Sequence, residues 1–210
     1  MIGSVENAVP SCTTVDLLRH GHCAGGDIFR GCGSDSSLTE KGWQQMSDAL
    51  AGLSGWQQIV TSPLQRCRSF AAASAHTLNI PLKEDNHWRE IDFGCWEGEP
   101  VEAVWGRWPE QVAAYFINPD QSTPHGGECL AAFQQRVQQG WRRLLGDYRN
   151  QHILLVQHGG TMRLLLTLLF NRPIAAMSRL VVPYGCLMRL KVWHLPNRDY
   201  VFLMPHKKGE

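Results

Sequence analysis

Short apolar runs alternate with helical segments along most of the chain, and this alternation restricts the fold more than any other feature. Between residues 14 and 170, strands are expected at 14–19, 57–62, 81–84 and 152–157, and helices at 37–53, 63–78, 127–149 and 161–170. Two further strands are expected on either side of a turn at Pro196-Asn197. Such alternation is typical of a parallel sheet covered by helices. We therefore predict an α/β fold, a three-layer α/β/α sandwich with a mostly parallel central sheet, in a single domain over residues 1–210.

Two of these helices carry sequence signals for their first turn. Ser37 and Glu40 have the spacing of a capping box, so the first helix is expected to begin near residue 37. Ser62 is followed by Pro63, which fits a helix start with serine as the N-cap and proline in the first turn. We expect Ser62 to open the helix that follows the second strand.

The charge of the chain is nearly balanced. Lys and Arg together number 20 and Asp and Glu 19, which gives a net charge of +1 at pH 7. This balance argues against broad binding to nucleic acid or to an anionic membrane, because both usually require a basic excess. No run approaches the ~18 apolar residues of a membrane helix. Any anion-binding site is therefore expected to be local.

The N-terminal segment and the cysteines indicate a reducing compartment. The segment MIGSVENAVPSCTTVD lacks the basic start and the apolar core of a signal peptide. The seven cysteines are scattered and form no CxxC pair, so neither a disulfide framework nor a zinc site is expected. His22 and Cys23 stand near His20, but no cysteine pair accompanies them, so no metal site is predicted. We expect a cytoplasmic protein with free thiols.

Basic side chains stand where three of the predicted strands end. The first strand ends on Arg19 and His20, Arg66 follows the second strand within a few residues, and the last of the four ends on His158. In parallel sheets, ligands bind beyond the carboxyl ends of the strands. Arginine binds phosphate through two N–H groups and keeps its charge, and the N-termini of the following helices add N–H donors. Together these features predict a site for a phosphoryl dianion.

A histidine in such a site can act as the nucleophile. A neutral imidazole that attacks phosphorus forms a phosphohistidine and divides the reaction into two steps. Neighbouring cations are expected to lower its pKa, and its second ring nitrogen is expected to donate to a backbone carbonyl so that the attacking nitrogen stays free. The other basic groups would neutralise charge on the equatorial oxygens. We therefore expect a phosphoryl-transfer enzyme.

The reaction also requires an acid that protonates the leaving oxygen. The segment HWREIDFGCWEG, residues 87–98, offers Glu90, Asp92 and Glu97 beside two tryptophans. An apolar loop next to a dianion favours a protonated carboxyl, as acid catalysis requires. The residue types alone do not choose among the three carboxylates.

Five motifs in order connect these features to a known family. LLRHG, TSPLQRCRSFA, REIDFGCWEG, HGGE and LLVQHGG each fall at a predicted strand end or loop. From about residue 14 to at least residue 185, the chain resembles the histidine phosphatase superfamily, which includes phosphoglycerate mutases and α-ribazole phosphatases. The resemblance implies a phosphoglycerate mutase-like fold and a phosphatase without a metal or organic cofactor. It also implies His20 as the phosphorylated nucleophile, Glu90 as the proton donor, and a phosphate pocket completed by Arg19, Arg66 and His158.

The resemblance is closest to the α-ribazole phosphatase branch, through GGDIFRG, LTEKGWQQM and DFGCWEG. It implies hydrolysis of α-ribazole 5′-phosphate in cobalamin nucleotide-loop assembly, or of a related small phosphorylated metabolite. Arg30 and Gly159 are further candidates for binding the substrate phosphate.

Three other functions remain open. Mutase-type members carry a pair of arginines after the acid loop, whereas this chain has only Arg107 between Glu90 and Arg136, so hydrolysis is favoured. A protein phosphatase acting on phosphohistidine needs a flatter docking site than the large segment at 86–128 would leave. A non-catalytic module that binds a phosphorylated metabolite ranks last, because all the expected catalytic residue types are present.

Residues 86–128 form an irregular segment with short helices expected near 100–117, and we expect it to act as a lid over the substrate. Its tryptophans are expected to form the apolar underside of the lid; alternatively, one of them stacks on a flat ring of the substrate. The tryptophans concerned are Trp88, Trp96, Trp105 and Trp108. The C-terminal hairpin offers an edge strand for a homodimer.

Overall fold

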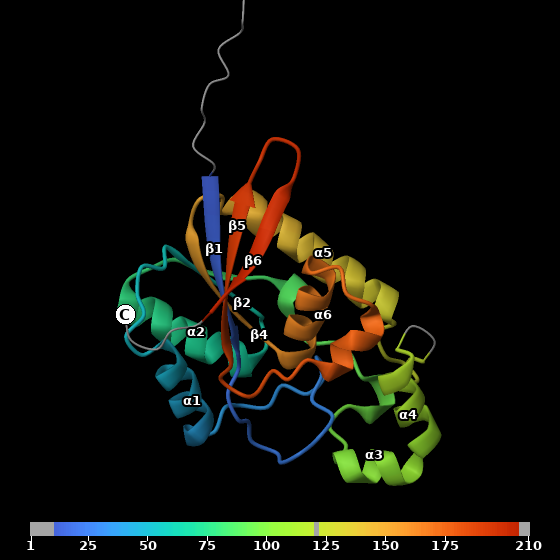
Figure 1. Ribbon diagram of the computed structural model, residues 1–210. Coiled ribbons are helices and arrows are strands. Elements are labelled where there is room, and N and C mark those ends of the chain that lie inside the picture. Colours follow the sequence, from blue (N-terminus) through green and yellow to red (C-terminus); the bar gives the residue numbers. More distant parts are fainter. Residues whose placement is uncertain (1–10, 120–121, 206–210) are drawn as a thin grey trace, which may run out of the picture.

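A six-stranded sheet forms the centre of the part of the chain that the structure describes. The computed structural model describes residues 11–119 and 122–205 (Figure 1). In the sheet order β3-β2-β4-β1-β5-β6, the strands are β3 (Leu82–Glu84), β2 (Gln58–Thr61), β4 (His152–Gln157), β1 (Ser11–Arg19), β5 (Leu187–His194) and β6 (Asp199–Met204). The first four are parallel, whereas β5 runs antiparallel to both β1 and β6. The sheet is therefore mixed and mostly parallel, as predicted.

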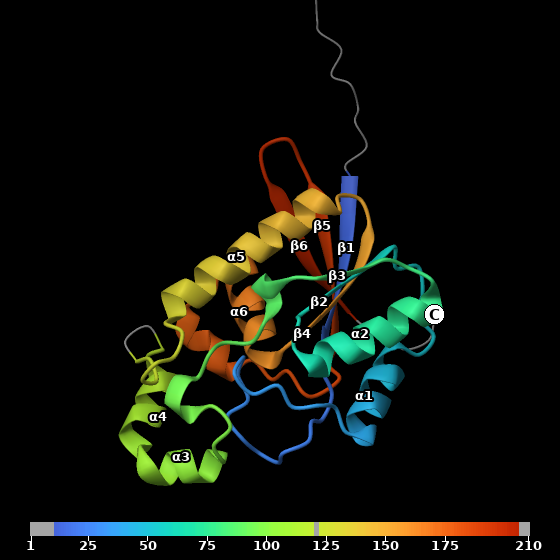
Figure 2. The same cartoon turned by 180° about the vertical axis from the view of Figure 1, so that it is seen from behind.

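Helices cover both faces of this sheet. On one side lie α1 (Glu40–Leu50) and α2 (Gln65–Leu78), and on the other α5 (Leu130–Asp147) and α6 (Gly159–Leu169) (Figure 1, Figure 2). Successive side chains of β4 enter opposite cores, because strand side chains alternate between faces. Ile153 and Leu155 pack with α5 and α6, whereas Leu154 and Val156 pack with α1 and α2. All four are fully buried, and each such burial contributes roughly 1.5–3 kcal/mol. The predicted three-layer arrangement is confirmed.

The predicted starts of two helices were wrong by two or three residues. α1 begins at Glu40, and its N-cap is Thr39, whose hydroxyl oxygen accepts from Gly42 N at 3.1 Å, rather than Ser37. α2 begins at Gln65 after Leu64. The predicted cap of α2, Ser62, lies three residues before the helix; its hydroxyl oxygen accepts from Leu64 N at 3.3 Å and lies 2.7 Å from His158 Nε2.

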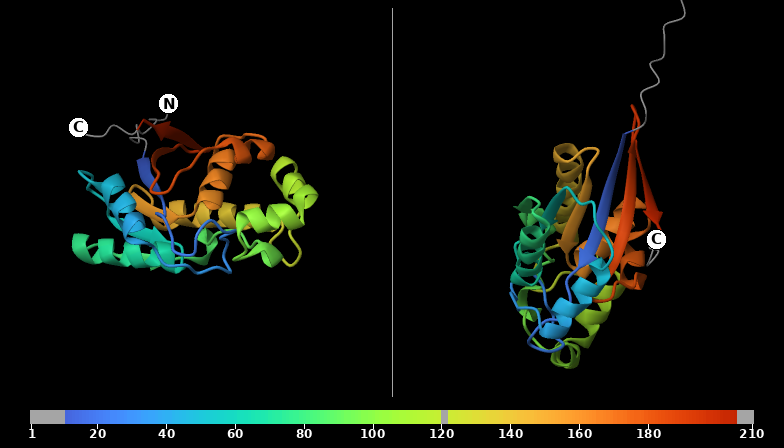
Figure 3. Two further views of the ribbon diagram at one scale, coloured as in Figure 1. Left: turned by 90° about the horizontal axis from the view of Figure 1, so that it is seen from below. Right: turned by 90° about the vertical axis from the view of Figure 1, so that its left-hand side faces the viewer.

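Two short helices form a small separate cluster beside the carboxyl ends of the parallel strands. α3 (Val101–Arg107) and α4 (Pro109–Ile117) lie at the side of the molecule away from α1 and α2 (Figure 3). Short 3₁₀ turns lie between β3 and α3, at η1 (Asn86–Trp88) and η2 (Gly94–Trp96), and between α6 and β5, at η3 (Ile174–Arg179). The cluster has its own buried core, formed by Phe29, Trp96, Val104, Val112 and Tyr115.

Within residues 11–119 and 122–205, none of the helices combines the length and the apolar character needed to cross a membrane.

A buried carboxylate stands in the middle of β1. Asp16 is fully buried and accepts hydrogen bonds from Arg189 Nε at 2.7 Å, Arg189 Nη2 and Trp56 Nε1 at 2.8 Å each, and it lies 2.9 Å from His152 Nε2. Burial alone would raise the pKa of Asp16, but the hydrogen bonds and charges of Arg189 and His152 outweigh it and lower the pKa to about 2. The group therefore joins β1, β4 and β5 through a charge that favours the folded state.

This pKa sets a pH dependence of stability. Because the pKa of Asp16 is about 2 in the folded state against an ordinary 3.8, its contribution is complete above pH 3.8 and is lost as the pH falls toward 2. Asp16→Asn should lower the free energy of unfolding by about 3 kcal/mol at pH 7, because it leaves Arg189 without its charge partner. Urea unfolding at several pH values measures both effects.

The matched control for this change is Asp48→Asn on the exposed side of α1, which should change the unfolding free energy by less than about 0.5 kcal/mol. Equal losses for Asp16→Asn and Asp48→Asn would contradict the role assigned to Asp16.

Candidate active site

Two histidines meet at the carboxyl ends of neighbouring strands. β1 and β4 pair in parallel with Arg19 opposite Gln157, so His20 and His158 follow directly at the same edge of the sheet. Their ring centroids lie 5.2 Å apart in an edge-to-face arrangement, and both residues are buried. The structure thus brings together the two strand ends that the sequence singled out.

The imidazole of His20 is held neutral with one nitrogen free. Its Nδ1 lies 2.8 Å from the carbonyl oxygen of Gly21, and because a carbonyl only accepts, Nδ1 carries the proton. Burial, followed by the charges of Arg66 and Arg19, holds the pKa of His20 well below its ordinary value. The Nε2 lone pair is then available to an electrophile.

Arg66 binds two loop carbonyls and the second histidine. It is fully buried, and it donates from Nη1 to Ser34 O at 2.6 Å, from Nη2 to Gly31 O at 2.8 Å, and from Nε to His158 Nδ1 at 3.2 Å. His158 Nε2 then donates to the hydroxyl of Ser62. Burial, followed by the charge of Arg66, holds the pKa of His158 well below its ordinary value. Both nitrogens of His158 are engaged within the protein, so it faces His20 with its ring.

Arg19 presents a donor without a partner. Its Nη1 donates to Val182 O at 2.5 Å, and its guanidinium carbon lies 4.1 Å from the centroid of the Tyr184 ring. Its Nε is buried and has no hydrogen-bond partner among the described residues. A Cβ atom on Gly159 would stand 3.0 Å from that Nε, so glycine leaves room for the guanidinium and its ligand. A buried donor without an acceptor is costly, and an anion would satisfy it.

Arg30 lines the same cleft but is fastened to its own loop. It donates from Nε to Ser36 Oγ at 3.2 Å and from Nη2 to the carbonyls of Ala24 and Gly26 at 3.0 and 2.8 Å. Its charge is one of those that lower the pKa of His20, after burial and the charges of Arg66 and Arg19. Arg30 therefore contributes a positive charge to the cleft without pairing to a carboxylate.

Glu90 lies against the start of α6. Its Oε2 accepts from Gly160 N at 2.8 Å, and its Oε1 accepts from Thr161 N at 3.0 Å, Thr161 Oγ1 at 3.2 Å and Ile91 N at 3.1 Å. The carboxylate thus caps the first turn of α6, whose N–H groups have no partner inside the helix. The sequence carried a signal for this contact, because the segment after His158 has no capping side chain of its own.

Of the three candidate acids, Glu90 is the one that lines the cleft with His20. This cleft has a volume of about 210 Å³, and its walls include Arg19, Arg30, Gly159, Gly160, Arg163 and Tyr184. Arg163 and Tyr184 were not predicted. Arg163 is the fifth residue of α6 and donates from Nε to Leu180 O at 2.9 Å, so long-range contacts place both residues there.

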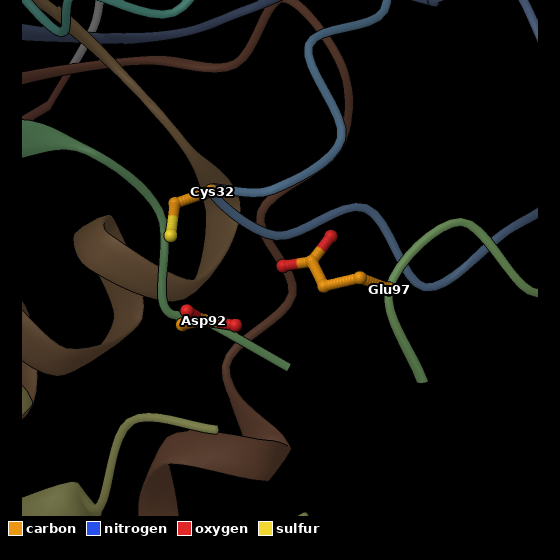
Figure 4. Close-up of side chains that lie close together, drawn as sticks. All are labelled: Cys32, Asp92 and Glu97. Carbon is orange, nitrogen blue, oxygen red and sulfur yellow. The ribbon is translucent and has the colours of Figure 1, made fainter. Parts of the chain in front are cut away.

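The other two acids join loops instead. Asp92 and Glu97 lie close to Cys32, with one ligand atom of each within 4.8 Å of the others (Figure 4). Glu97 accepts from four donors, namely Gly31 N, Gly33 N, Ser34 Oγ and Phe93 N, and Asp92 accepts from Gly94 N. Burial, followed by the charge of Asp92, raises the pKa of the Cys32 thiol to about 11. The cluster therefore holds the 31–34 loop against the acid loop through hydrogen bonds. A metal site would instead require a thiolate and free carboxylate oxygens.

A second, apolar cavity adjoins the cleft. It has a volume of about 160 Å³ and shares Phe93, Gly160 and Arg163 with the cleft. The remaining apolar wall comes from Ile91, Tyr115, Phe116, Phe133, Ile174 and Met177. An apolar group attached to an anion in the cleft would find a complementary surface there.

The four tryptophans of residues 86–128 line neither cavity. Trp88 and Trp96 are buried in the cores, Trp108 packs against the α3–α4 cluster, and Trp105 stacks on Phe116 with ring centroids 6.3 Å apart. The expectation that one of them stacks on a ligand ring therefore has no support. Phenylalanine and tyrosine supply the aromatic surface instead.

Comparison with known proteins gives a consistent family match. The model of the family "Histidine phosphatase superfamily (branch 1)" matches residues 15–197. A bifunctional protein of Mycobacterium tuberculosis is 32% identical over 172 residues, which cover 80% of this chain and 47% of the relative. The chain thus spans about half the length of the first curated relatives that it matches.

Two further relatives are similar over more of their own length. The adenosylcobalamin/alpha-ribazole phosphatase of Escherichia coli strain K12 is 28% identical over 81% of this chain and 85% of the relative. The solved structure of a mycobacterial glucosyl-3-phosphoglycerate phosphatase superposes with a TM-score of 0.80 at 22% identity and covers 91% of this chain and 97% of that chain. The similarity to this solved structure supports the fold.

The space beside Gly159 generates a direct test of anion binding. Gly159→Ala should weaken the binding of inorganic phosphate about tenfold, because its Cβ would crowd Arg19 Nε and a charge-assisted hydrogen bond contributes ~1.5–3 kcal/mol. Isothermal titration calorimetry measures the Kd. Gly146→Ala on α5, where a Cβ meets open space, is the control and should bind phosphate like the wild type. Identical Kd values for both variants would show that phosphate binds elsewhere.

Proposed function

The chain belongs to branch 1 of the histidine phosphatase superfamily, and on this premise we propose that it is a phosphomonoesterase that works through a phosphohistidine on His20. One observation carries the proposal. A neutral imidazole with a free Nε2 stands in a cleft beside an arginine whose buried Nε has no acceptor. Nucleophile and anion receptor are thus preassembled in the same place.

The first step transfers the phosphoryl group to the protein. The substrate dianion binds beside Arg19 and Arg30, which line the cleft, while the fully buried Arg66 contributes its charge. His20 Nε2 attacks phosphorus while the ester P–O bond breaks. The leaving oxygen takes a proton from Glu90. The products of this step are the alcohol and phosphohistidine.

The second step restores the enzyme. A water molecule attacks the phosphohistidine, the N–P bond breaks, and the carboxylate of Glu90 takes the proton of that water. Inorganic phosphate leaves, and Glu90 is protonated for the next cycle. His158 orients Arg66 through the bond between Arg66 Nε and His158 Nδ1, and Gly159 leaves space for Arg19. These steps use only side chains and water.

For the substrate, we propose α-ribazole 5′-phosphate. The support is the likeness to the Escherichia coli adenosylcobalamin/alpha-ribazole phosphatase and the apolar cavity beside the cleft. An aromatic base suits the wall formed by Phe93, Tyr115 and Phe116, and Arg163 at the junction suits a ribose hydroxyl. A mutase-type transfer has weaker support, because Arg107 does not line the cleft. Its guanidinium carbon lies 5.0 Å from the centroid of the Trp108 ring.

The catalytic proposal is tested by phosphate release from α-ribazole 5′-phosphate, phosphoserine, 3-phosphoglycerate and p-nitrophenyl phosphate. In the presence of a chelator, the wild type should hydrolyse α-ribazole 5′-phosphate with the highest kcat/KM, and His20→Ala should lose at least ~10³-fold on every substrate, because covalent catalysis is lost. His76→Ala on the exposed face of α2 is the control and should keep its activity. Undiminished turnover by His20→Ala would contradict catalysis through a phosphohistidine on His20.

The substrate proposal is tested separately by filling the apolar cavity. Ser178→Trp adds an indole at the cavity wall and should lower kcat/KM for α-ribazole 5′-phosphate about tenfold or more, while p-nitrophenyl phosphate loses less, because its smaller ring needs less of the cavity. Ala175→Trp, an exposed neighbour on the same 3₁₀ turn that does not line the cavity, is the matched control. Equal effects of the two substitutions on both substrates would show that the cavity does not bind the substrate.

A further inference from the structure

Arg136 on α5 binds the loop that carries Glu90 through hydrogen bonds. Its Nη1 donates to the carbonyl oxygens of His87 and Arg89 at 2.9 and 2.8 Å, and its Nη2 lies 3.4 Å from the carbonyl oxygen of Glu90 itself. Its Nε and Nη2 also donate to the two carboxylate oxygens of Glu128 at 2.9 and 2.6 Å. One guanidinium group therefore contacts three carbonyl oxygens between His87 and Glu90 and one carboxylate.

This contact is rigid and largely shielded from water. The side chains of Arg136 and Glu128 are only 12% and 11% exposed. The guanidinium carbon lies 4.9 Å from the centroid of the Phe133 ring, which supports it from below. A planar group with donors in a fixed fork loses little freedom when it binds several acceptors, and lysine cannot reproduce that fork. The position of the Arg136 guanidinium group therefore fixes the position of the loop carbonyls that it binds.

The loop needs such a support because it has little structure of its own. After η1, the chain from Arg89 to Phe93 forms neither helix nor strand. Its carbonyl groups require partners from elsewhere, and Arg136 provides them on the α5 side. On the opposite side, the carboxylate of Glu90 is bound by Gly160 N and Thr161 N of α6. Glu90 is thus held at its backbone by one helix and at its carboxylate by another.

We propose that Arg136, fixed by Glu128, is a positioning residue that sets the place of the Glu90 carboxyl for proton transfer to the leaving group. This inference rests on the proposed function, in which Glu90 is the acid. A general acid acts only within hydrogen-bond reach of the oxygen that it protonates, and a displacement of about 1 Å can cost roughly 10²-fold in rate. Neither Arg136 nor Glu128 lines the cleft with His20, so their effect passes through the loop.

The test compares two substrates of nearly equal shape. p-Nitrophenyl phosphate has an acidic leaving group that departs without a proton, whereas phenyl phosphate releases phenol, whose pKa is about 10 and which needs the acid. Arg136→Lys should lower kcat/KM for phenyl phosphate about 30- to 100-fold and that for p-nitrophenyl phosphate less than about threefold. Arg142→Lys, an exposed arginine on the same helix, is the control and should change neither value.

A double-mutant cycle separates positioning from general support. Glu90→Gln alone should show the same preference for the acidic leaving group, and adding Arg136→Lys to it should cause no further loss on phenyl phosphate, because the acid is already absent. Losses that multiply in the double variant, or an equal loss on both substrates, would overturn the positioning role. If Glu90→Gln is selective and Arg136→Lys is not, the inference fails while the proposed function stands. If Glu90→Gln shows no selectivity, the assignment of the acid fails first.

A second variant covers the case in which Arg136→Lys does not fold, as judged by circular dichroism. Glu128→Gln keeps the shape of the partner but removes the charge that fixes Arg136. It should produce the same selectivity at about five- to tenfold, since one charge-assisted pair is weakened rather than lost. A folded Glu128→Gln variant with unaltered leaving-group selectivity would contradict the proposal.

Discussion

The site depends on positive charge that is held in place without being neutralised. Arg19, Arg30, Arg66 and Arg163 all reach the carboxyl ends of the parallel strands, and the partners they have among the described residues are carbonyl oxygens, a hydroxyl and an imidazole nitrogen. Neutral acceptors fix a guanidinium group but leave its charge for a ligand. The same charge, added to burial, keeps His20 and His158 neutral. A dianion that enters the cleft satisfies the arginines and meets an unprotonated imidazole.

Two of the buried or loop-binding carboxylates lie away from this charge. Asp16 pairs with Arg189 and His152 inside β1, away from the cleft, and Glu97 binds backbone N–H groups of the 31–34 loop. Glu90 alone among the three acids of its segment enters the cleft, and there it is bound by the N–H groups of α6. The irregular loops that deliver these groups are fixed by side chains from helices, with Arg66 of α2 on Gly31 and Ser34 and Arg136 of α5 on the acid loop.

The parts of the fold that follow from local pattern could be predicted, and the parts that follow from distant contacts could not. The apolar runs at 14–19 and 152–157 predicted two strands of a mostly parallel sheet, and the observed pairing of β1 with β4 brings His20 and His158 together. By contrast, Ser37 and Ser62 carry local cap signals, yet Thr39 caps α1 and the hydroxyl of Ser62 is drawn to His158, 96 residues away in the chain.

The same limit explains the missed and misjudged site residues. Tyr184 stands in an irregular connection and reaches Arg19 only after β5 has paired with β1. Trp88 and Trp96 suggested a stacking surface by composition, but Trp88 is buried in the core between the sheet and α5 and α6, and Trp96 in the core of the α3–α4 cluster. The residue types alone did not choose among Glu90, Asp92 and Glu97, and only the resemblance pointed to Glu90; the structure adds that the first N–H groups of α6 bind its carboxylate.

Catalysis through His20 is tested most directly by detecting a phosphoryl group on this residue. The enzyme is mixed with a phosphomonoester, quenched within milliseconds in alkali, in which phosphohistidine survives, and examined by intact mass and peptide mapping. A fraction of the protein should gain the mass of one phosphoryl group, mapped to the peptide that contains His20 and absent from His20→Ala. Turnover without any phosphoprotein, or a phosphoryl group on another residue, would contradict catalysis through His20.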